Sequence, residues 1–366
     1  MIVAINRTDA IGDTLLTLPM AKVIKHHYPD AKIIFIISPR TQELFANARD
    51  VDEVWTIDPK KNWPGQVWSL YQKFSKNHVD TYFYVGGAHW ITFCAWLAGV
   101  TFRGGLISRW PSFLFLNKGQ RQSRRMVVMH EAEYNLNLLT GLEIDWSILS
   151  EETWRENLIT MTAKELEQAD KILQDTCKIT PEQEFIVIHP GMSGHTLNWS
   201  SRNYGRLITR LLDANLERFR FIVSFTPSDL NFLLGIKDHL GRPEYQKYKG
   251  KIHFFDGSKI GLRLYMAILK KAKLFVGPST GPTHLATALG TPVVALYSPI
   301  KIQSAKRWGP LAVRTDQVKT IVPDVVCGEV HHCAGEVCPY YECMAIVEVE
   351  DVAKEVNKLL LEPKAK

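Results

Sequence analysis

The sequence lacks the features that mark several common protein classes. No apolar run in its 366 residues is long enough to span a membrane. The first residues, Met1 to Arg7, lack the basic, apolar and small-residue order of a signal peptide, so we expect a first strand there and a cytoplasmic protein. No G-x-G-x-x-G follows that strand, which removes the main signal of a dinucleotide-dependent dehydrogenase, and no Walker loop is present.

Cysteine is sparse. Two of the six cysteines are isolated, and the other four form a late group with the spacing C-x5-C-x4-C-x4-C: Cys327, Cys333, Cys338 and Cys343. This group encloses His331 and His332 and could in principle bind zinc, but it contains no C-x2-C knuckle. We expect reduced structural thiols and no metal, and the sequence does not disclose what the group does.

Length and charge set two further limits. A chain of 366 residues exceeds one ordinary domain, so two domains are expected. The net charge of +6 and the pI of about 8.9 suit an anionic partner such as a sugar nucleotide, a phosphorylated glycolipid or an acidic membrane surface, and give no indication of a nucleic acid. A mild positive excess is also common on enzymes that touch no membrane.

The first hundred residues alternate short apolar runs with helical patterns. The expected strands are 2–5, 32–37, 54–57 and 81–85, and the expected helices are 12–27, 40–47 and 64–77. Such alternation predicts a parallel sheet covered on both faces, with ligands at the carboxyl ends of the strands.

The stretch 275–299 reads as strand, helix and strand. Ser279 or Thr280 can cap the helix, and Pro282 fits its first turn. A helix that begins in this way beside a sheet's carboxyl edge offers free N–H groups and a positive dipole end, which is a phosphate site. The alternative is an ordinary capped helix start.

This stretch resembles the signature of the family 9 glycosyltransferases, whose best-known members are ADP-heptose:lipopolysaccharide heptosyltransferases. The matching positions are Thr280, Gly281, Pro282, His284, Ala286, Ala288, Gly290 and Pro292. Ser279 stands where the family usually has Asp. Residues 12–19 resemble the family's N-terminal motif Gly-Asp-x-Leu-x-Thr-Leu-Pro.

Within that motif, Gly12 permits a close backbone approach, and Asp13 would stand at a helix start. From the residues alone, Asp13 is either an N-cap or a functional carboxylate. The resemblance implies that Asp13 is the general base, with Gly12 and Thr14 on the acceptor side.

The second half opens with a strand that ends in His189-Pro190-Gly191, similar to the family's next motif. Ser193 can donate to a phosphate oxygen or be a simple turn serine. The family usually has Lys at the position of Leu197, so His195 or Arg202 would have to supply the missing charge, although Arg202 can equally be an exposed residue without a ligand. The donor-binding set expected from the resemblance is Ser193, His195, Arg202, Ser279, Thr280, Gly281, Pro282 and His284.

An aromatic run, Trp110 to Leu116, leads directly into four cations: Lys118, Arg121, Arg124 and Arg125. Such a segment suits a membrane interface or a phosphorylated glycolipid, and we expect it to bind the acceptor. The alternative is a buried segment followed by a solvated loop.

The resemblance implies the α/β class and the GT-B architecture, two doubly wound Rossmann-like domains that face a central cleft. We expect an acceptor domain at 1–175, a linker near 173–184, an ADP-sugar domain at 182–345, and a final helix in 346–366 that packs back on the first domain.

The implied reaction is inverting transfer of heptose from ADP-heptose to the lipopolysaccharide inner core or a lipid A precursor. It would take place at the inner face of the cytoplasmic membrane, with no cofactor besides the donor. The alternatives are a family 9 transferase that uses another nucleotide sugar, or a non-catalytic glycolipid- or nucleotide-binding module. The donor sugar, the linkage and the oligomeric state stay open.

Overall fold

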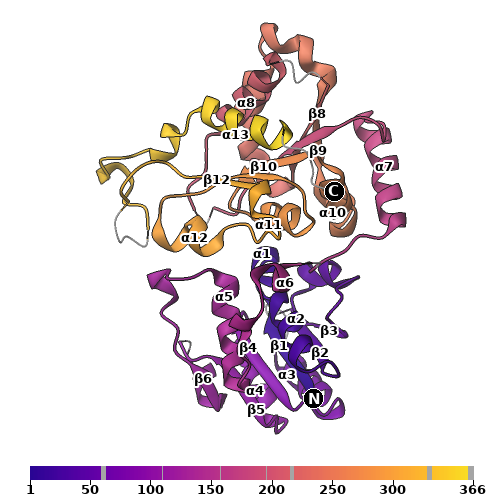
Figure 1. Cartoon of the computed structure of the whole chain (residues 1–366), viewed down its shortest axis with the longest axis vertical. Coiled ribbons are helices and arrows are strands. Elements are labelled where there is room, and N and C mark those ends of the chain that lie inside the picture. The colour runs from indigo at the N-terminus through magenta and orange to yellow at the C-terminus, as the bar shows by residue number, and fades with distance from the viewer. Residues whose placement is uncertain are drawn as a thin grey trace. The chain divides into compact units, whose positions relative to one another are not determined.

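The chain folds into two compact units, Met1–Thr160 and Met161–Lys366, each built on a six-stranded parallel sheet with helices around it (Figure 1). The computed structural model describes residues 1–58, 63–108, 110–156, 158–194, 196–214, 218–327 and 332–361. The predicted class, α/β with two doubly wound domains, is confirmed. No helix in the described ranges combines the length and the apolar character needed to cross a membrane.

Unit 1 has the strand order β3-β2-β1-β4-β5-β6. Its central strands are almost continuous runs of buried apolar residues, which is typical of a parallel sheet covered on both faces. The strands are β1 (Ile2–Arg7), β2 (Lys32–Ile37), β3 (Glu53–Thr56), β4 (Thr81–Gly86), β5 (Phe102–Leu106) and β6 (Lys118–Gln120). The α-helices are α1 (Ile11–Leu15), α2 (Leu18–His27), α3 (Trp63–Lys76), α4 (Trp90–Leu97), α5 (Glu131–Leu136) and α6 (Glu151–Arg155).

The single helix predicted over 12–27 is divided into α1 and α2. Pro19 lies in the first turn of α2, where its missing N–H costs nothing, but a proline there cannot continue a preceding helix. The break therefore makes α1 a short turn that carries Asp13 directly above the end of β1.

Unit 2 has the equivalent order, β12-β11-β10-β7-β8-β9. Its strands are β7 (Phe185–Ile188), β8 (Arg220–Phe225), β9 (Ile252–Asp256), β10 (Leu274–Pro278), β11 (Val293–Leu296) and β12 (Val318–Ile321). Its α-helices are α7 (Ala163–Cys177), α8 (Ser201–Asp213), α9 (Leu234–Leu240), α10 (Leu262–Lys271), α11 (Gly281–Ala288), α12 (Ala305–Trp308) and α13 (Val349–Leu361).

In both units the first strand lies next to the fourth, β1 beside β4 and β7 beside β10. At this point the strand order reverses direction, and the two loops that leave the carboxyl ends of the two strands diverge. Ligands of open α/β sheets bind in the crevice between such loops. Each unit therefore has one topologically defined place for a ligand.

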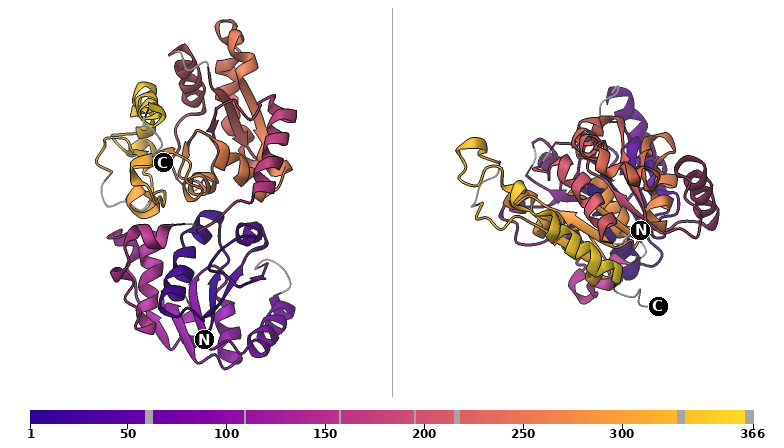
Figure 2. Two further views of the ribbon diagram at one scale, coloured as in Figure 1. Left: turned by 45° about the vertical axis from the view of Figure 1, so that its right-hand side comes forward. Right: turned by 90° about the horizontal axis from the view of Figure 1, so that it is seen from above.

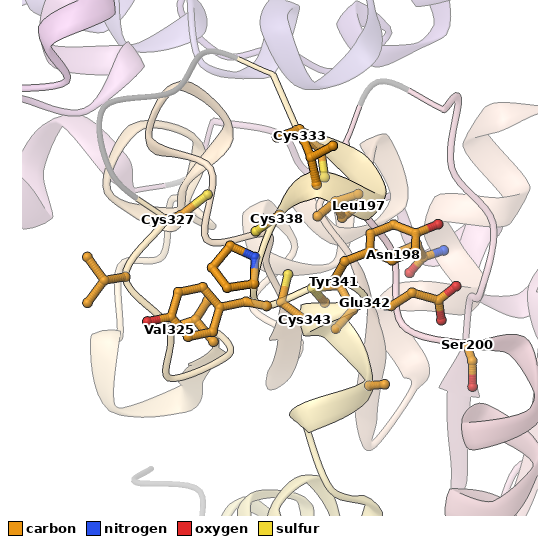
Figure 3. A pocket seen from close by; sticks show the side chains of 17 residues that line it. Leu197, Asn198, Ser200, Val325, Cys327, Cys333, Cys338, Tyr341, Glu342 and Cys343 are labelled. Atoms are coloured by element: carbon orange, nitrogen blue, oxygen red, sulfur yellow. The ribbon is translucent and has the colours of Figure 1, made fainter.

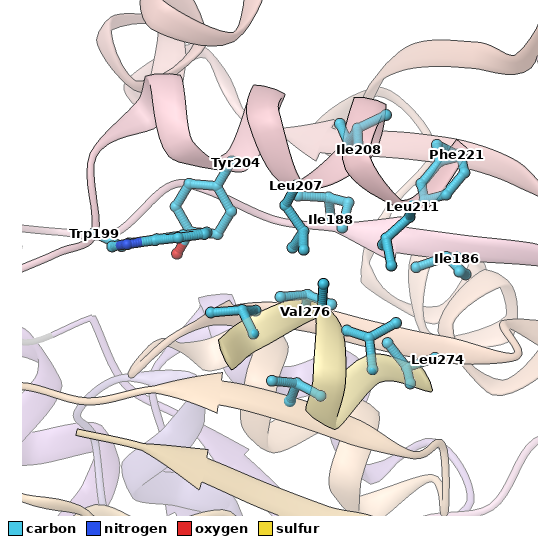
Figure 4. Packing of buried hydrophobic residues seen from close by; sticks show 14 of the residues in the cluster. Ile186, Ile188, Trp199, Tyr204, Leu207, Ile208, Leu211, Phe221, Leu274 and Val276 are labelled. Atoms are coloured by element: carbon cyan, nitrogen blue, oxygen red, sulfur yellow. The ribbon is translucent and has the colours of Figure 1, made fainter. Parts of the chain in front are cut away.

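The core of unit 2 joins the sheet to distant parts of the chain (Figure 4). Trp199 and Tyr204 are fully buried and pack edge to face, with 5.1 Å between ring centroids. The indole Nε1 of Trp199 donates to the carbonyl oxygen of Val347 over 2.9 Å, which satisfies the polar end of this buried ring.

The boundary between the units differs from the linker predicted at 173–184. Helix α7 lies alongside α10 (Figure 1), and two ion pairs hold it there, Glu165 with Arg263 and Asp170 with Lys271. The boundary therefore falls after Thr160, before α7, because these contacts make the helix part of unit 2.

The final helix also differs from its prediction. Helix α13, yellow in Figure 2, buries Val352, Val356 and Leu359 in the core of unit 2 and packs against α8 (Figure 1), β10 and β11. It was expected to pack back on the N-terminal domain, but its apolar stripe is already covered within unit 2.

Candidate active site

In unit 1 the candidate catalytic residue lies at the β1–β4 switch point. Asp13 is in the first turn of α1, and its side chain is 25% exposed. Its Oδ1 accepts a bond from the guanidinium of Arg7, while Oδ2 has no hydrogen-bond partner among the residues that the structure describes. Asp13 therefore presents one anchored and one open carboxylate oxygen.

The neighbours of Asp13 do not all have the predicted roles. The N-cap of α1 is Ala10, so the capping interpretation of Asp13 is wrong. Gly12 lies inside α1 without a positive φ angle. Thr14 is fully buried and its hydroxyl donates to the carbonyl oxygen of Ala10 over 3.0 Å, so this hydroxyl is not available to an acceptor.

The sequence interpretation missed Arg7, the last residue of β1. It is 4% exposed and pairs with both Asp13 and Asp9, the latter over 3.2 Å from its Nε. Burial acts to lower the pKa of Arg7, but the carboxylates of Asp13, Asp9 and Glu131 outweigh it and raise that pKa. A buried strand that ends in Arg before a loop with two carboxylates is a pattern that could have indicated this pairing.

The four cations predicted to bind the acceptor fall into two groups. Lys118, Arg121 and Arg125 are exposed. Arg124 is only 11% exposed, forms an ion pair with the buried Glu131, and donates to Asn135 over 3.1 Å. Arg124 is thus committed to the interior of unit 1.

The aromatic segment before these cations is not buried. After the Trp110–Pro111 peptide, residues Ser112–Phe115 form one 3-10 turn that packs against α4. Phe115 contacts Phe93 and Trp96 of α4, with ring centroids 5.2 and 5.5 Å apart. The exposed apolar side chains of this region, here called the aromatic patch, are Trp96, Leu97, Trp110, Phe113 and Leu114.

In unit 2 the phosphate site predicted at 279–284 lies at the β7–β10 switch point. Thr280 is the N-cap of α11 by position but makes no side-chain capping bond, and Pro282 lies in the first turn. Thr280, Gly281 and Pro282 are partly exposed, and the main-chain N–H of Gly281 has no acceptor in the described part of the chain. This helix start is therefore open to an anion.

Two members of the same stretch face inward. Ser279 is 6% exposed and lies next to the buried hydroxyl of Tyr297. His284 is also buried and has a partner of its own. These two buried side chains pack beneath the exposed part of the loop, which is formed by Thr280 and Gly281.

The loop after β7 rests on a buried polar row. Nδ1 of His189 is 3.0 Å from Oγ of Ser224, which is in turn 3.0 Å from the hydroxyl of Tyr265. Burial lowers the pKa of His189 to about 4, although Asp229 and Ser224 act in the opposite direction, so the imidazole is neutral near pH 7. Asp229 accepts from the N–H of Thr226 over 2.8 Å and so completes a capping box at the start of the 3-10 segment Pro227–Leu233.

The remaining donor candidates differ in their surroundings. Ser193 is exposed, and His195 lies outside the described residues. Leu197, at the family's Lys position, packs against the core of unit 2. Arg202 is paired with Asp238 over 2.5 Å and lowers the pKa of that carboxyl, so the interpretation of Arg202 as an exposed residue without a ligand is favoured.

Cations after β11 were missed. Lys301 and Arg307 are half-buried, and Lys306 is exposed. They follow a buried parallel strand, so the strand pattern alone could have located them at the ligand edge of the sheet.

The four late cysteines line a cavity of about 560 Å³ together with Leu197, Asn198 and Ser200 from the loop before α8 (Figure 3). All four thiols are free. Burial raises the pKa of Cys343, and the other three thiols raise it further. In the described ranges, no three His, Cys, Asp or Glu side chains are arranged to hold a metal ion.

The match to a known protein family lies mainly in unit 2. The family model for glycosyltransferase family 9 (heptosyltransferase) matches residues 156–329. This range contains the 279–292 motif and leaves out the motif at 12–19.

Known proteins extend the similarity to most of the chain. A Haemophilus influenzae protein provisionally named a glycosyltransferase is 25% identical over 315 residues, which cover 84% of this chain and 86% of that protein. The lipopolysaccharide core heptosyltransferase OpsX of the same organism is 22% identical over 80% of this chain and 78% of its own. The structure of Escherichia coli ADP-heptose lipopolysaccharide heptosyltransferase II has the same fold, with a TM-score of 0.76, 19% identity and 98% of each chain covered.

Proposed function

We propose that the chain is a glycosyltransferase similar to family 9. It transfers heptose from ADP-heptose to the inner core of lipopolysaccharide, with inversion at the anomeric carbon. The observation that carries this proposal is Asp13, a partly exposed carboxylate at a switch point with one oxygen held by Arg7 and the other open. A general base needs this combination of fixed orientation and access.

In the proposed reaction, Asp13 accepts the proton of the acceptor hydroxyl as that oxygen attacks the anomeric carbon. The new bond joins the acceptor oxygen to this carbon, and the bond from the carbon to the diphosphate breaks. Its electron pair leaves with ADP. The reaction needs no metal ion and no cofactor besides the donor.

The donor diphosphate is proposed to bind at the start of α11. The open N–H of Gly281, the Thr280 hydroxyl and the positive end of the helix dipole would stabilise the charge that develops on the leaving ADP. Hydrogen bonds to charged groups contribute about 1.5–3 kcal/mol each, which makes this helix start a substantial part of donor binding.

We propose that unit 1 binds the acceptor and contacts the membrane. The aromatic patch exposes Trp96, Leu97 and Trp110, and the exposed cations Lys118, Arg121 and Arg125 follow in the same segment or close after it. Aromatic rings at the level of lipid headgroups, with cations nearby for anionic phosphates, are typical of a peripheral contact with the inner face of the cytoplasmic membrane.

The test is turnover of ADP-heptose on defined truncated lipopolysaccharides by the wild type and by Asp13→Asn. The Asn side chain keeps the shape and one acceptor for Arg7 but cannot take a proton. We expect kcat to fall by about 10²–10⁴, with ADP affinity and Tm nearly unchanged. Turnover within a few-fold of the wild type would place the base elsewhere.

Two alternative functions predict different results in a binding experiment. A family 9 transferase with another donor would gain thermal stability from a nucleotide other than ADP, because binding to the native state raises Tm. A non-catalytic binding module would gain stability from ADP, yet would form no glycoside with any acceptor.

A further inference from the structure

Arg7 is a buried cation, and burial of a charge without partners would cost free energy of folding. Its guanidinium is buried at the end of β1, donates from Nη1 to the carbonyl oxygen of Val85 over 3.1 Å, and pairs with Asp13 and Asp9. Because burial of a cation is unfavourable unless it is fully paired, these three acceptors explain why the side chain stays in this place. They also fix its direction across the switch point, from β1 toward β4.

A second layer lies behind Arg7. Glu131, at the start of α5, is 2% exposed and is close enough to raise the pKa of Arg7. Glu131 is held by Arg124, and Arg124 also contacts Asn135, whose amide donates to the carbonyl oxygen of Leu16 over 3.0 Å. Leu16 directly follows α1. The network thus runs from Asp13 in α1 to the residue that directly follows this short helix.

We propose that Arg7 is a positioning residue for Asp13, and that it acts by holding Oδ1 so that Oδ2 faces the acceptor hydroxyl. This inference rests on the proposed function, in which Asp13 is the general base. Lys could supply the charge of Arg7, but its single ammonium group lacks the planar fork that serves Asp13, Asp9 and Val85 together.

A double-mutant cycle separates positioning from general support of the fold. The variants are Arg7→Gln, Asp13→Asn and their combination, with single-turnover rates measured at saturating ADP-heptose. We expect Arg7→Gln to lower kcat about 10- to 100-fold in the wild-type background, as substitution of orienting partners commonly does. In the Asp13→Asn background the same change should alter kcat less than about twofold, because residues that act as a unit are not additive.

A second variant keeps every charge. A Cβ added at Gly86 would stand 2.7 Å from Nη1 of Arg7 and 2.7 Å from Oδ2 of Asp9, so Gly86→Ala displaces the guanidinium without removing it. It should reproduce the loss of kcat with donor KM within about twofold of wild type. The matched control is Gly250→Ala, where the added methyl group meets nothing within 4 Å.

The outcomes are distinct. If Arg7→Gln lowers kcat equally in both backgrounds, or if it leaves kcat unchanged while Asp13→Asn is inactive, the positioning role is overturned and the base assignment stands. If Asp13→Asn retains turnover, both proposals fail. If Arg7→Gln does not fold, the same cycle with Gly86→Ala decides.

Discussion

The ion pair between Glu165 of α7 and Arg263 of α10 makes a quantitative prediction about unit 2. Nε and Nη2 of Arg263 each donate to a different oxygen of Glu165 over 2.7 Å, and the two side chains are 11% and 17% exposed. The perturbation is Arg263→Gln. It removes the charge but leaves Glu165 free to continue capping α7 through Thr162.

The magnitude follows from the carboxyl group. The bond from Arg263 is the largest cause that lowers the pKa of Glu165, from an ordinary 4.5 to about 2. That difference corresponds to about 3.4 kcal/mol at about 1.36 kcal/mol per pKa unit. Bonds from Thr162 supply part of it, and solvent screens the rest, so we expect Arg263→Gln to lower the free energy of unfolding by about 1–2.5 kcal/mol at pH 7.

The pH dependence has a definite sign. Since the pKa of Glu165 is lower in the folded protein than in the unfolded chain, the stabilisation is complete above pH 4.5 and disappears as the pH falls toward about 2. Urea unfolding followed by circular dichroism at pH 7 and pH 3 should show a smaller difference between wild type and variant at pH 3.

The control is Lys171→Gln, which removes an exposed pair with Glu167 on the same helix. It should leave the free energy of unfolding unchanged at either pH, because solvent screens a fully exposed pair. An Arg263→Gln effect as small as this control, or one that is equal at pH 7 and pH 3, would refute the reasoning.

The remaining predictions concern the candidate donor site of unit 2 and the arginines of unit 1. Arg202→Ala should leave the ADP Kd within about twofold of wild type, since Asp238 already pairs this charge, and a weakening of about tenfold by calorimetry would restore Arg202 as the substitute for the missing Lys. The double variant Arg121→Ser/Arg125→Ser should raise the acceptor's apparent KM and weaken liposome co-sedimentation with Tm unchanged, because both side chains are exposed. Arg124→Ser should instead lower Tm by several degrees, because it removes the Arg124 charge from the buried Glu131. Equal behaviour of the three arginines would contradict this division.

Much of the fold could be predicted because buried parallel strands are locally recognisable. Runs such as Lys32–Ile37 and Phe185–Ile188 contain almost only apolar residues, so their identity as strands does not depend on distant contacts. The position of α13 could not be predicted in this way, because an amphipathic stripe shows that a helix is covered but not by what. The same reason explains the misplaced boundary near α7.

The candidate site residues also divide into those that adjacent residues determine and those that distant contacts determine. The helix start at Thr280 is encoded by adjacent residues and is present as predicted, although its role with a ligand stays a prediction. The Arg7–Asp13 pair joins residues that are close in the chain, whereas the bond from Arg7 to Val85 depends on β1 lying beside β4, and the burial of Thr14 depends on packing. Three-dimensional neighbours decided these points, and a motif that matches residue by residue cannot separate Arg124 from Arg125.

The switch points also bear on how the candidate site of each unit can change during evolution. Each is completed by strands and loops of its own unit, Arg7 with Val85 in one and His189 with Val276 in the other. A substitution that reshapes the loop after β10 therefore changes none of the contacts that unit 1 itself supplies to Asp13. Under the proposed function, a lineage can therefore change its nucleotide sugar through substitutions in unit 2 alone while Asp13 in unit 1 is retained.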